Sequence, residues 1–144
     1  MAGANYRTFL ELMRCAKWVE TIYNRALKGE GMTVTQYETL LCLVEGGPLK
    51  PAAITERLGS DSGSLPRILD RLERDGWARR VPNKDDARSV LIELTAEGKR
   101  KMVGVLEKIR QTTRKLTSEF SEKDSTAFSM SLDKVMKAAR EMRQ

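Results

Sequence analysis

The chain has 144 residues, 26 lysines and arginines against 20 aspartates and glutamates, a formal net charge of +6, and no histidine. This length suits one domain, or one small domain with extensions used for assembly. The lack of histidine excludes Ser–His and Cys–His catalytic pairs and zinc sites with histidine ligands, so we expect no enzyme, no metal site and no cofactor. The positive charge is a mild indication of a polyanionic partner.

Composition also indicates where the chain works. The two cysteines, Cys15 and Cys42, are too few for a disulfide framework and favour a reducing compartment, which we expect to be the cytoplasm. No apolar stretch approaches the roughly 18 residues of a membrane span, so we expect no membrane partner. The N-terminal stretch meets Glu11 early and lacks the apolar core of a secretory signal.

Residues 4–29 have the pattern of a long helix. Apolar side chains recur at helical spacing from Phe9 to Leu27, and a flanking set that includes Trp18 widens the stripe past half the helix circumference. A stripe this wide predicts burial against two surfaces, the helix's own domain and a partner chain. Gly29 and Gly31 are expected to end the helix.

Three shorter helices are expected to follow, each bounded by a cap residue or a helix breaker. They are predicted to run from Thr33 or Thr35 to the Gly46-Gly47-Pro48 segment, from Pro51 to Leu58, and from near Asp61-Ser62 to Asp75. Gly59 is expected to close the second of these helices, and Gly76 is the expected C-cap of the third.

A change of pattern after residue 76 predicts a β-hairpin. Residues 77–81 and 89–94 are strand-like, and the polar segment 82–87 between them is expected to form an extended turn. In the second strand Val90, Ile92 and Leu94 are expected to share one face.

Two long helices complete the predicted order. Thr95 is expected to cap the first of them in a capping box with Glu97, and this helix is expected to run to about Leu116. Ser121 is expected to cap the last helix, which carries apolar residues at helical spacing.

This order of elements predicts a mainly α-helical protein with a small β-hairpin wing, that is, a winged helix-turn-helix. The long helices at the two chain ends do not fit inside so small a module, and the economical way to bury their apolar faces is against each other in a homodimer. We therefore predict an N-terminal dimerisation helix in residues 1–30, a DNA-binding domain in residues 31–100, and C-terminal dimerisation helices in residues 101–144.

The helix expected near residues 61–75 carries a candidate DNA-binding face. Its arginines are spaced three or four residues apart, so they share one face opposite the apolar stripe. Hydroxyls at its start can meet phosphates or base edges, and the arginines can reach guanine edges or phosphates in the major groove. The candidate contacts are Ser62, Ser64, Arg67, Arg71 and Arg74. The alternative is a solvated face with ion pairs such as Asp70–Arg74.

The expected hairpin tip supplies two further candidate contacts, Lys84 and Arg88, beside Asp85 and Asp86. Acidic residues suit a DNA-facing tip if Asp86 holds the Arg88 guanidinium in a fixed rotamer through a bidentate pair, so that the guanidinium projects into the minor groove. The alternative is an ordinary polar turn with a surface ion pair worth less than about 1 kcal/mol.

The most informative motifs are Asp61-Ser62-Gly63-Ser64-Leu65-Pro66-Arg67 and Asp85-Asp86-Ala87-Arg88, the latter followed by a strand and Leu94-Thr95-Ala96-Glu97-Gly98. With these motifs the sequence resembles the MarR/SlyA family of bacterial transcription regulators over nearly the whole chain. The resemblance implies a homodimeric repressor that binds double-stranded DNA at a palindromic operator. It also implies that Arg88 is the minor-groove arginine, that Asp86 holds it, and that the helix bearing Arg67 is the recognition helix.

The resemblance also implies a signal that controls DNA binding. Family members often bind small aromatic or phenolic anions between the dimer helices and the DNA-binding lobe, so we expect an effector of this kind to release the DNA. The candidate lining residues are Arg14, Trp18, Tyr23 and Tyr37. The alternative for these aromatic side chains is plain core packing.

Oxidation of a cysteine thiol is an alternative signal. Segments 61–65 and 88–92 are similar to the organic-hydroperoxide-sensing OhrR branch, which senses through a cysteine in the first helix, where Cys15 lies. Cys15 and Cys42 also lie on or beside apolar stripes, where a cysteine is usually a small core residue. A helical assembly module that does not bind DNA is a third alternative, and the arginine face argues against it.

Overall fold

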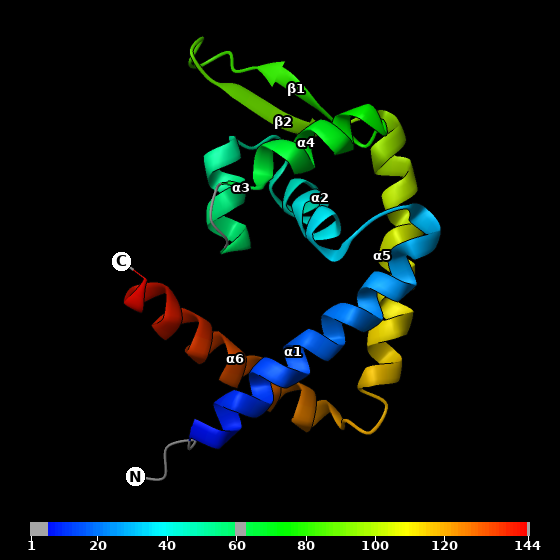
Figure 1. Cartoon of the computed structure of the whole chain (residues 1–144), viewed down its shortest axis with the longest axis vertical. Helices are drawn as coiled ribbons and strands as arrows, with labels where there is room; N and C mark the ends of the chain where they lie inside the picture. The colour runs from blue at the N-terminus through cyan, green and yellow to red at the C-terminus, as the bar shows by residue number, and fades with distance from the viewer. Residues whose placement is uncertain (1–5, 60–62, 144) are drawn as a thin grey trace. The chain divides into compact units, whose positions relative to one another are not determined.

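The elements of the computed structural model follow the predicted order: the fold is mainly helical with a two-stranded antiparallel hairpin (Figure 1). The structure describes residues 6–59 and 63–143. The chain divides into two compact units, Met1–Thr112 and Thr113–Gln144. The elements are α1 (Tyr6–Leu27), the 3₁₀ helix η1 (Lys28–Glu30), α2 (Val34–Gly46), α3 (Pro51–Leu58), α4 (Leu65–Arg74), β1 (Ala78–Pro82), β2 (Val90–Leu94), α5 (Ala96–Leu116) and α6 (Glu122–Met142).

The first long helix, α1, ends earlier than the sequence indicated. Its last residue is Leu27, and η1 carries the chain on to Glu30. Gly31 then stops the helical turn with φ of 63°, and its N–H donates to the Lys28 carbonyl at 3.0 Å. Leu27 is the one buried residue of α1 in the described part of the helix. The expected apolar stripe of α1 is therefore only partly covered within this chain, and Phe9, Met13 and Trp18 are exposed.

The start of α2 is fixed by a reciprocal pair of hydrogen bonds, and Thr33 rather than Thr35 is its N-cap. The Thr33 hydroxyl oxygen accepts from the Gln36 N–H at 3.3 Å, and the Gln36 Oε1 accepts from the Thr33 N–H at 2.9 Å. The helix turns Leu40 and Leu43 into the core of the first unit. The fully buried large side chains of that core are Leu27, Leu40, Ile54, Leu72, Ile92, Met102 and Val105.

An isolated β-bridge joins Leu49, which lies between α2 and α3, to the hairpin. The Leu49 N–H donates to the Ile92 carbonyl at 3.0 Å, and the Ile92 N–H donates to the Leu49 carbonyl at 2.8 Å. Pro51 begins α3 two residues later, and Gly59 closes it in a left-handed conformation, as expected. The bridge thereby ties the start of α3 to the hairpin.

The C-terminus of α4 ends in a Schellman motif, which confirms that Gly76 stops this helix. Gly76 has φ of 77°, and its N–H donates to the Glu73 carbonyl at 3.1 Å. The Trp77 N–H donates to the Leu72 carbonyl at 2.8 Å, and both side chains belong to the core. The predicted start near Asp61-Ser62 lies outside the described residues.

The hairpin pairs β1 with β2 in a register that runs from Ala78 opposite Leu94 to Pro82 opposite Val90. Ile92 and Leu94 are buried, whereas Val90, which the alternation predicts on the same face, is 44% exposed. Val90 lies at the end of the strand next to the turn, and the turn extends away from α2, α3 and α4 (Figure 1). The core therefore covers only the base of the hairpin.

Thr95 caps α5 as expected, but the predicted capping box with Glu97 is wrong. The Thr95 Oγ1 accepts from the Gly98 N–H at 2.9 Å and donates to the Gly76 carbonyl at 2.6 Å. Gly98 occupies the third helical position, where the box needs Glu or Gln, and Glu97 instead pairs with Lys101 at 3.0 Å. A Cβ on Gly98 would lie 2.0 Å from the Trp77 carbonyl oxygen, so glycine permits the close approach of the two segments.

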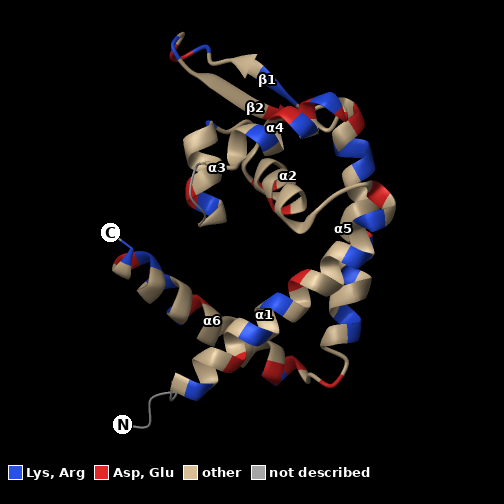
Figure 2. Cartoon of the chain, in the orientation of Figure 1, with Lys and Arg blue, Asp and Glu red and all other residues tan. Residues whose placement is uncertain are grey.

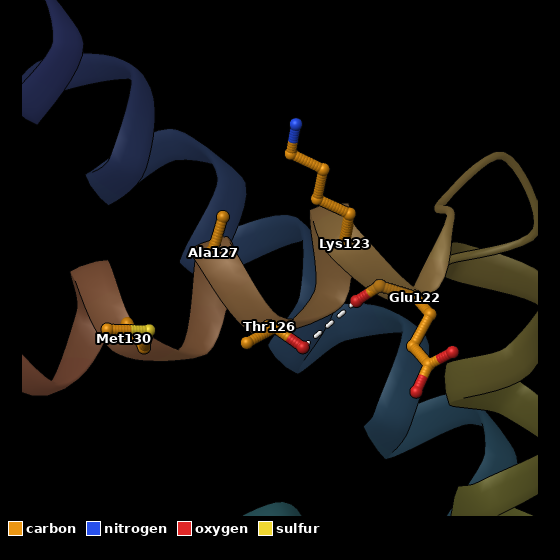
Figure 3. A pocket seen from close by; sticks show the side chains of 5 residues that line it. All are labelled: Glu122, Lys123, Thr126, Ala127 and Met130. Carbon is orange, nitrogen blue, oxygen red and sulfur yellow. Dashed lines mark hydrogen bonds between the residues drawn. The ribbon is translucent and has the colours of Figure 1, made fainter.

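The second unit contains α6, whose cap is the one expected. The Ser121 hydroxyl oxygen accepts from the Asp124 N–H at 3.1 Å, and the Asp124 Oδ2 accepts from the Ser121 N–H at 3.0 Å. Figure 3 shows an open depression on the first turns of α6, where the Thr126 hydroxyl donates to the Glu122 carbonyl at 3.0 Å. Neither α6 nor any other helix among the described residues is both long and apolar enough to span a bilayer.

Candidate nucleic-acid interface

The helix α4 has one buried face and one basic face, as its sequence indicated. Leu65, Leu69 and Leu72 are buried, and the arginines of the opposite face are exposed. The exposed arginines are Arg67, Arg71 and Arg74. Ser64 is the N-cap, and among the described residues its side chain makes no capping hydrogen bond. Ser62 lies outside the described residues.

The three arginines of α4 differ in their partners. Asp75 lies 3.7 Å from the Arg71 Nε and 3.5 Å from the Arg74 Nε, so these two guanidinium groups share one carboxylate. Arg71 also donates to the Gly31 carbonyl at 3.5 Å. Within residues 6–59 and 63–143, Arg67 has no carboxylate at ion-pair distance, which leaves it the most available cation of the helix.

Asp70 pairs with Arg80 of β1, although the solvated-face alternative paired it with Arg74. The Arg80 Nη2 lies 2.7 Å from the Asp70 Oδ1, and the Arg80 Nη1 lies 2.5 Å from the Glu73 Oε2. These hydrogen bonds, that to Asp70 first, raise the pKa of Arg80 above its usual range. The acidic side chains of α4 are thus turned toward the hairpin and engaged there.

The hairpin turn is organised by Asn83, a residue that the sequence analysis did not single out. Its side-chain Nδ2 donates to the Ser89 Oγ at 2.9 Å, and its Oδ1 accepts from the Asp85 N–H at 3.1 Å. Asn83 is buried although it lies in a polar turn. Its place in a Pro-Asn-Lys-Asp-Asp run is the only available signal, because Asn side chains commonly bond the backbone two residues on.

Asp86 supports the wing by a different contact from the one expected. Its Oδ1 accepts from the backbone N–H of Arg88 at 3.1 Å, and no bidentate pair with the Arg88 guanidinium is present among the described side chains. Its Oδ2 lies 3.7 Å from the Nζ of Lys50, the residue before α3. The Arg88 N–H, the Ser89 side chain and Lys50 lower the pKa of Asp86 below its usual range.

The two candidate DNA contacts of the hairpin tip, Lys84 and Arg88, are consequently not engaged in ion pairs among the described residues. In the part of the chain that the structure describes, Lys84 and the Arg88 guanidinium have no carboxylate at ion-pair distance, and both residues are exposed. Lys and Arg occur on α4, at the hairpin tip and along α5 (Figure 2). The fold therefore holds free cations on a helix and on a hairpin tip of the same winged helix, a combination suited to a major and a minor groove.

The candidate effector residues lie at different depths. Tyr37 is in the core, Tyr23 is half-buried against it, and Arg14 and Trp18 are exposed, Trp18 by 67%. Burial first, and then the neighbouring Tyr23, raises the pKa of the Tyr37 hydroxyl above its usual range. Arg14 and Tyr23 are nine residues apart on α1, or about 14 Å along the helix axis. The chain by itself does not gather the four residues into one group.

The two cysteines also differ. Cys15 is exposed on α1, whereas Cys42 is buried in α2. Burial raises the pKa of the Cys42 thiol, which favours the unreactive thiol form. The prediction that Cys15 is a core residue is therefore wrong within this chain, because the face of α1 that carries it is uncovered.

Comparison with known proteins supports the same assignment of the fold. A family model described as the MarR family matches residues 32–90. The HTH-type transcriptional regulator PecS of Dickeya dadantii is 30% identical over 129 residues, which cover 88% of this chain and 78% of PecS. The multiple antibiotic resistance protein MarR of Salmonella typhimurium is 37% identical over 79 residues, 55% of either chain, so this chain spans about half the length of that relative.

A solved structure adds a DNA complex. The structure of reduced AbfR bound to DNA is 27% identical in sequence, with a TM-score of 0.79, and the match covers 96% of this chain and 94% of AbfR. The similarity therefore extends well beyond residues 32–90, the segment matched by the family model.

Proposed function

Because this chain belongs to the MarR family, we propose that it is a sequence-specific DNA-binding transcriptional regulator that represses genes as a homodimer on a palindromic operator in the cytoplasm. The observation that carries the proposal is that Arg67 on α4, and Lys84 and Arg88 at the hairpin tip, have no carboxylate at ion-pair distance among the described residues. Such cations form ion pairs with DNA phosphates and donate hydrogen bonds to base edges. The DNA-bound structure of AbfR, a relative in fold and sequence, supports the same partner.

In this proposal α4 is the recognition helix. Arg67 and Ser64 lie at its N-terminal half, the part of a recognition helix that contacts base edges. Arg71 and Arg74 follow in the last turns of the helix and contact DNA phosphates. Lys84 and Arg88 reach the adjacent groove from the hairpin tip.

The homodimer accounts for the uncovered apolar side chains of the terminal helices. On α1 the exposed large apolar residues are Tyr6, Phe9, Leu10, Met13 and Trp18. On α6 they are Phe128, Met130, Met136 and Met142. Apolar faces this extensive are unfavourable in water, and a second copy of the chain is the simplest partner to cover them. Residues 1–30 and 101–144 are accordingly proposed as the dimerisation segments around a DNA-binding domain in residues 31–100.

The proposed signal is a small aromatic or phenolic anion that releases the dimer from DNA. Arg14 would supply positive charge, and Trp18, Tyr23 and Tyr37 aromatic surface, once a second chain covers α1. Thiol oxidation at Cys15 is the second proposal for the signal, because Cys15 is exposed within one chain whereas Cys42 is buried. Under that proposal Cys15→Ser abolishes release by peroxide, and Cys42→Ser leaves release intact.

Selection of a DNA library on the purified wild-type chain tests the proposed function. We expect enrichment of one palindromic sequence, binding of two chains per site, and an affinity that falls steeply as salt rises. If no sequence is enriched and no salt-sensitive binding appears, the chain is instead an assembly module. The genes beside the selected operator then indicate which effector class to test.

A further inference from the structure

Arg80 joins the hairpin to the helix α4 through three contacts. Its two terminal nitrogens contact Asp70 at 2.7 Å and Glu73 at 2.5 Å, and its backbone N–H donates to the Glu73 Oε1 at 3.2 Å. Asp70 and Glu73 are three residues apart, so they lie on adjacent turns of one helix face. One planar guanidinium therefore spans two turns of α4 from a fixed position on β1.

The position of Arg80 on β1 is set by the hairpin itself. Arg80 pairs with Ile92, a buried residue that is also bridged to Leu49. The Arg80 side chain is only 35% exposed, whereas that of its neighbour Arg79 is 61% exposed. β1 is paired with β2, and the Arg80 backbone N–H is itself bonded to Glu73, so the main chain holds the guanidinium beside the two carboxylates.

The two carboxylates are a liability on a helix that meets DNA. Asp70 lies three residues after Arg67, so it is a neighbour of the cation proposed to read bases. An unpaired carboxylate there would repel phosphates and would compete with DNA for the arginines of α4. Arginine is suited to removing both charges, because its rigid fork presents donors to two acceptors at once, which the single ammonium of lysine does not.

We propose that Arg80 is a positioning residue for DNA binding, which fixes the recognition helix against the wing and neutralises Asp70 and Glu73 without itself contacting DNA. The inference rests on the proposed function. Both terminal nitrogens of Arg80 are occupied by carboxylates, so a phosphate contact would require these ion pairs to break. Arg79 is the matched control, since it lies next in the strand and pairs with Glu93 within the hairpin.

The test compares Arg80→Gln in two backgrounds, the wild-type chain and the chain carrying both Asp70→Asn and Glu73→Gln. Binding to the operator duplex selected with the wild-type chain is measured by fluorescence anisotropy, well below the melting temperature of each variant. We expect Arg80→Gln to weaken binding about tenfold in the wild-type background and less than about twofold in the neutralised background. Arg80→Lys keeps the charge but not the fork, and we expect a loss between these values.

The difference between the affinity losses in the two backgrounds tests the positioning role. If Arg80 only stabilises the folded chain, Arg80→Gln lowers the melting temperature and leaves the affinity of the folded protein unchanged, which would also contradict the proposal. An equal loss in both backgrounds would mean that Arg80 contacts DNA directly, and would overturn the proposal. Arg79→Gln, with the same change of charge, should cost less than about threefold. If the wild-type chain itself binds no DNA, the proposed function fails, and the inference with it.

Discussion

The carboxylate of Asp86 accepts a hydrogen bond from the backbone N–H of Arg88 at 3.1 Å, and so it fixes the main chain of the wing rather than its guanidinium. This contact is of the Asx type, in which a side chain closes a turn two residues on. The Lys50 Nζ lies 3.7 Å from the other oxygen of this carboxylate, Asp86 Oδ2. The Arg88 side chain is consequently free to reach out from an ordered backbone.

This contact predicts a pH dependence of the wing. The pKa of Asp86 in the folded chain is below the ordinary value of 3.8, so the ordering is complete above that value and is lost as pH falls through the lower folded pKa. The chemical shift of the Arg88 amide proton should therefore titrate with a midpoint below 3.8. In Asp86→Asn the amide oxygen still accepts but does not ionise, so the shift should stay flat. A midpoint at or above 3.8 would refute the prediction.

Arg88→Ala should weaken operator binding by about 1–3 kcal/mol, or roughly 5- to 150-fold. The reason is that its guanidinium has no carboxylate partner among the described residues and is free for the minor groove. The dimer should be unaffected, because the hairpin tip lies apart from α1 in the sequence and carries no large apolar side chain. Titrations at matched salt, with sedimentation as the control for the dimer, check both parts. Unchanged affinity would remove Arg88 from the interface.

The arginines of α4 should contribute unequally to operator binding. Arg67→Ala should cost about 1–3 kcal/mol of operator binding and relax base preference at one position of each half-site, since Arg67 is unpaired near the start of the helix. Arg74→Ala removes the same charge from a side chain that is already paired with Asp75, and should cost less than about 1 kcal/mol. Binding to the operator and to single-base variants of it distinguishes the two. Equal losses for both variants, without a change of base preference, would assign Arg67 to phosphate contact alone.

Local signals account for the parts of the fold that the sequence predicted well. Thr33 with Gln36 caps α2, Pro51 starts α3, and the alternation of Ile92 with Leu94 marks the buried face of β2. Each depends on residues within one or two turns of chain, where spacing carries the geometry. The positions of the cations on α4 and at the hairpin tip follow from the same short-range spacing.

The contacts that were missed connect segments far apart in the sequence. The pairing of Arg80 with Asp70 depends on how β1 lies against α4, and that of Lys50 with Asp86 on the bridge between Leu49 and β2. Charge and helical spacing allow several partners for Asp70, and Arg74, four residues along the helix, is only one of them. Tertiary packing, which orders these segments, decides among such partners and leaves no periodic signal.

Gly98 and Gly104 of α5 offer a matched pair for testing the joint between the wing and this helix. A Cβ at Gly98 would lie 2.0 Å from the backbone oxygen of Trp77 and 3.2 Å from the Thr95 Oγ1. Because a backbone carbonyl cannot move aside without disturbing the Thr95 cap, Gly98→Ala should lower the free energy of unfolding by roughly 2–3 kcal/mol. At Gly104 a Cβ meets nothing within 4 Å, so Gly104→Ala should raise it by about 0.5–1 kcal/mol through helix propensity. Urea denaturation of the two variants measures both effects, and a Gly98→Ala variant as stable as wild type would mean that the two segments separate at little cost.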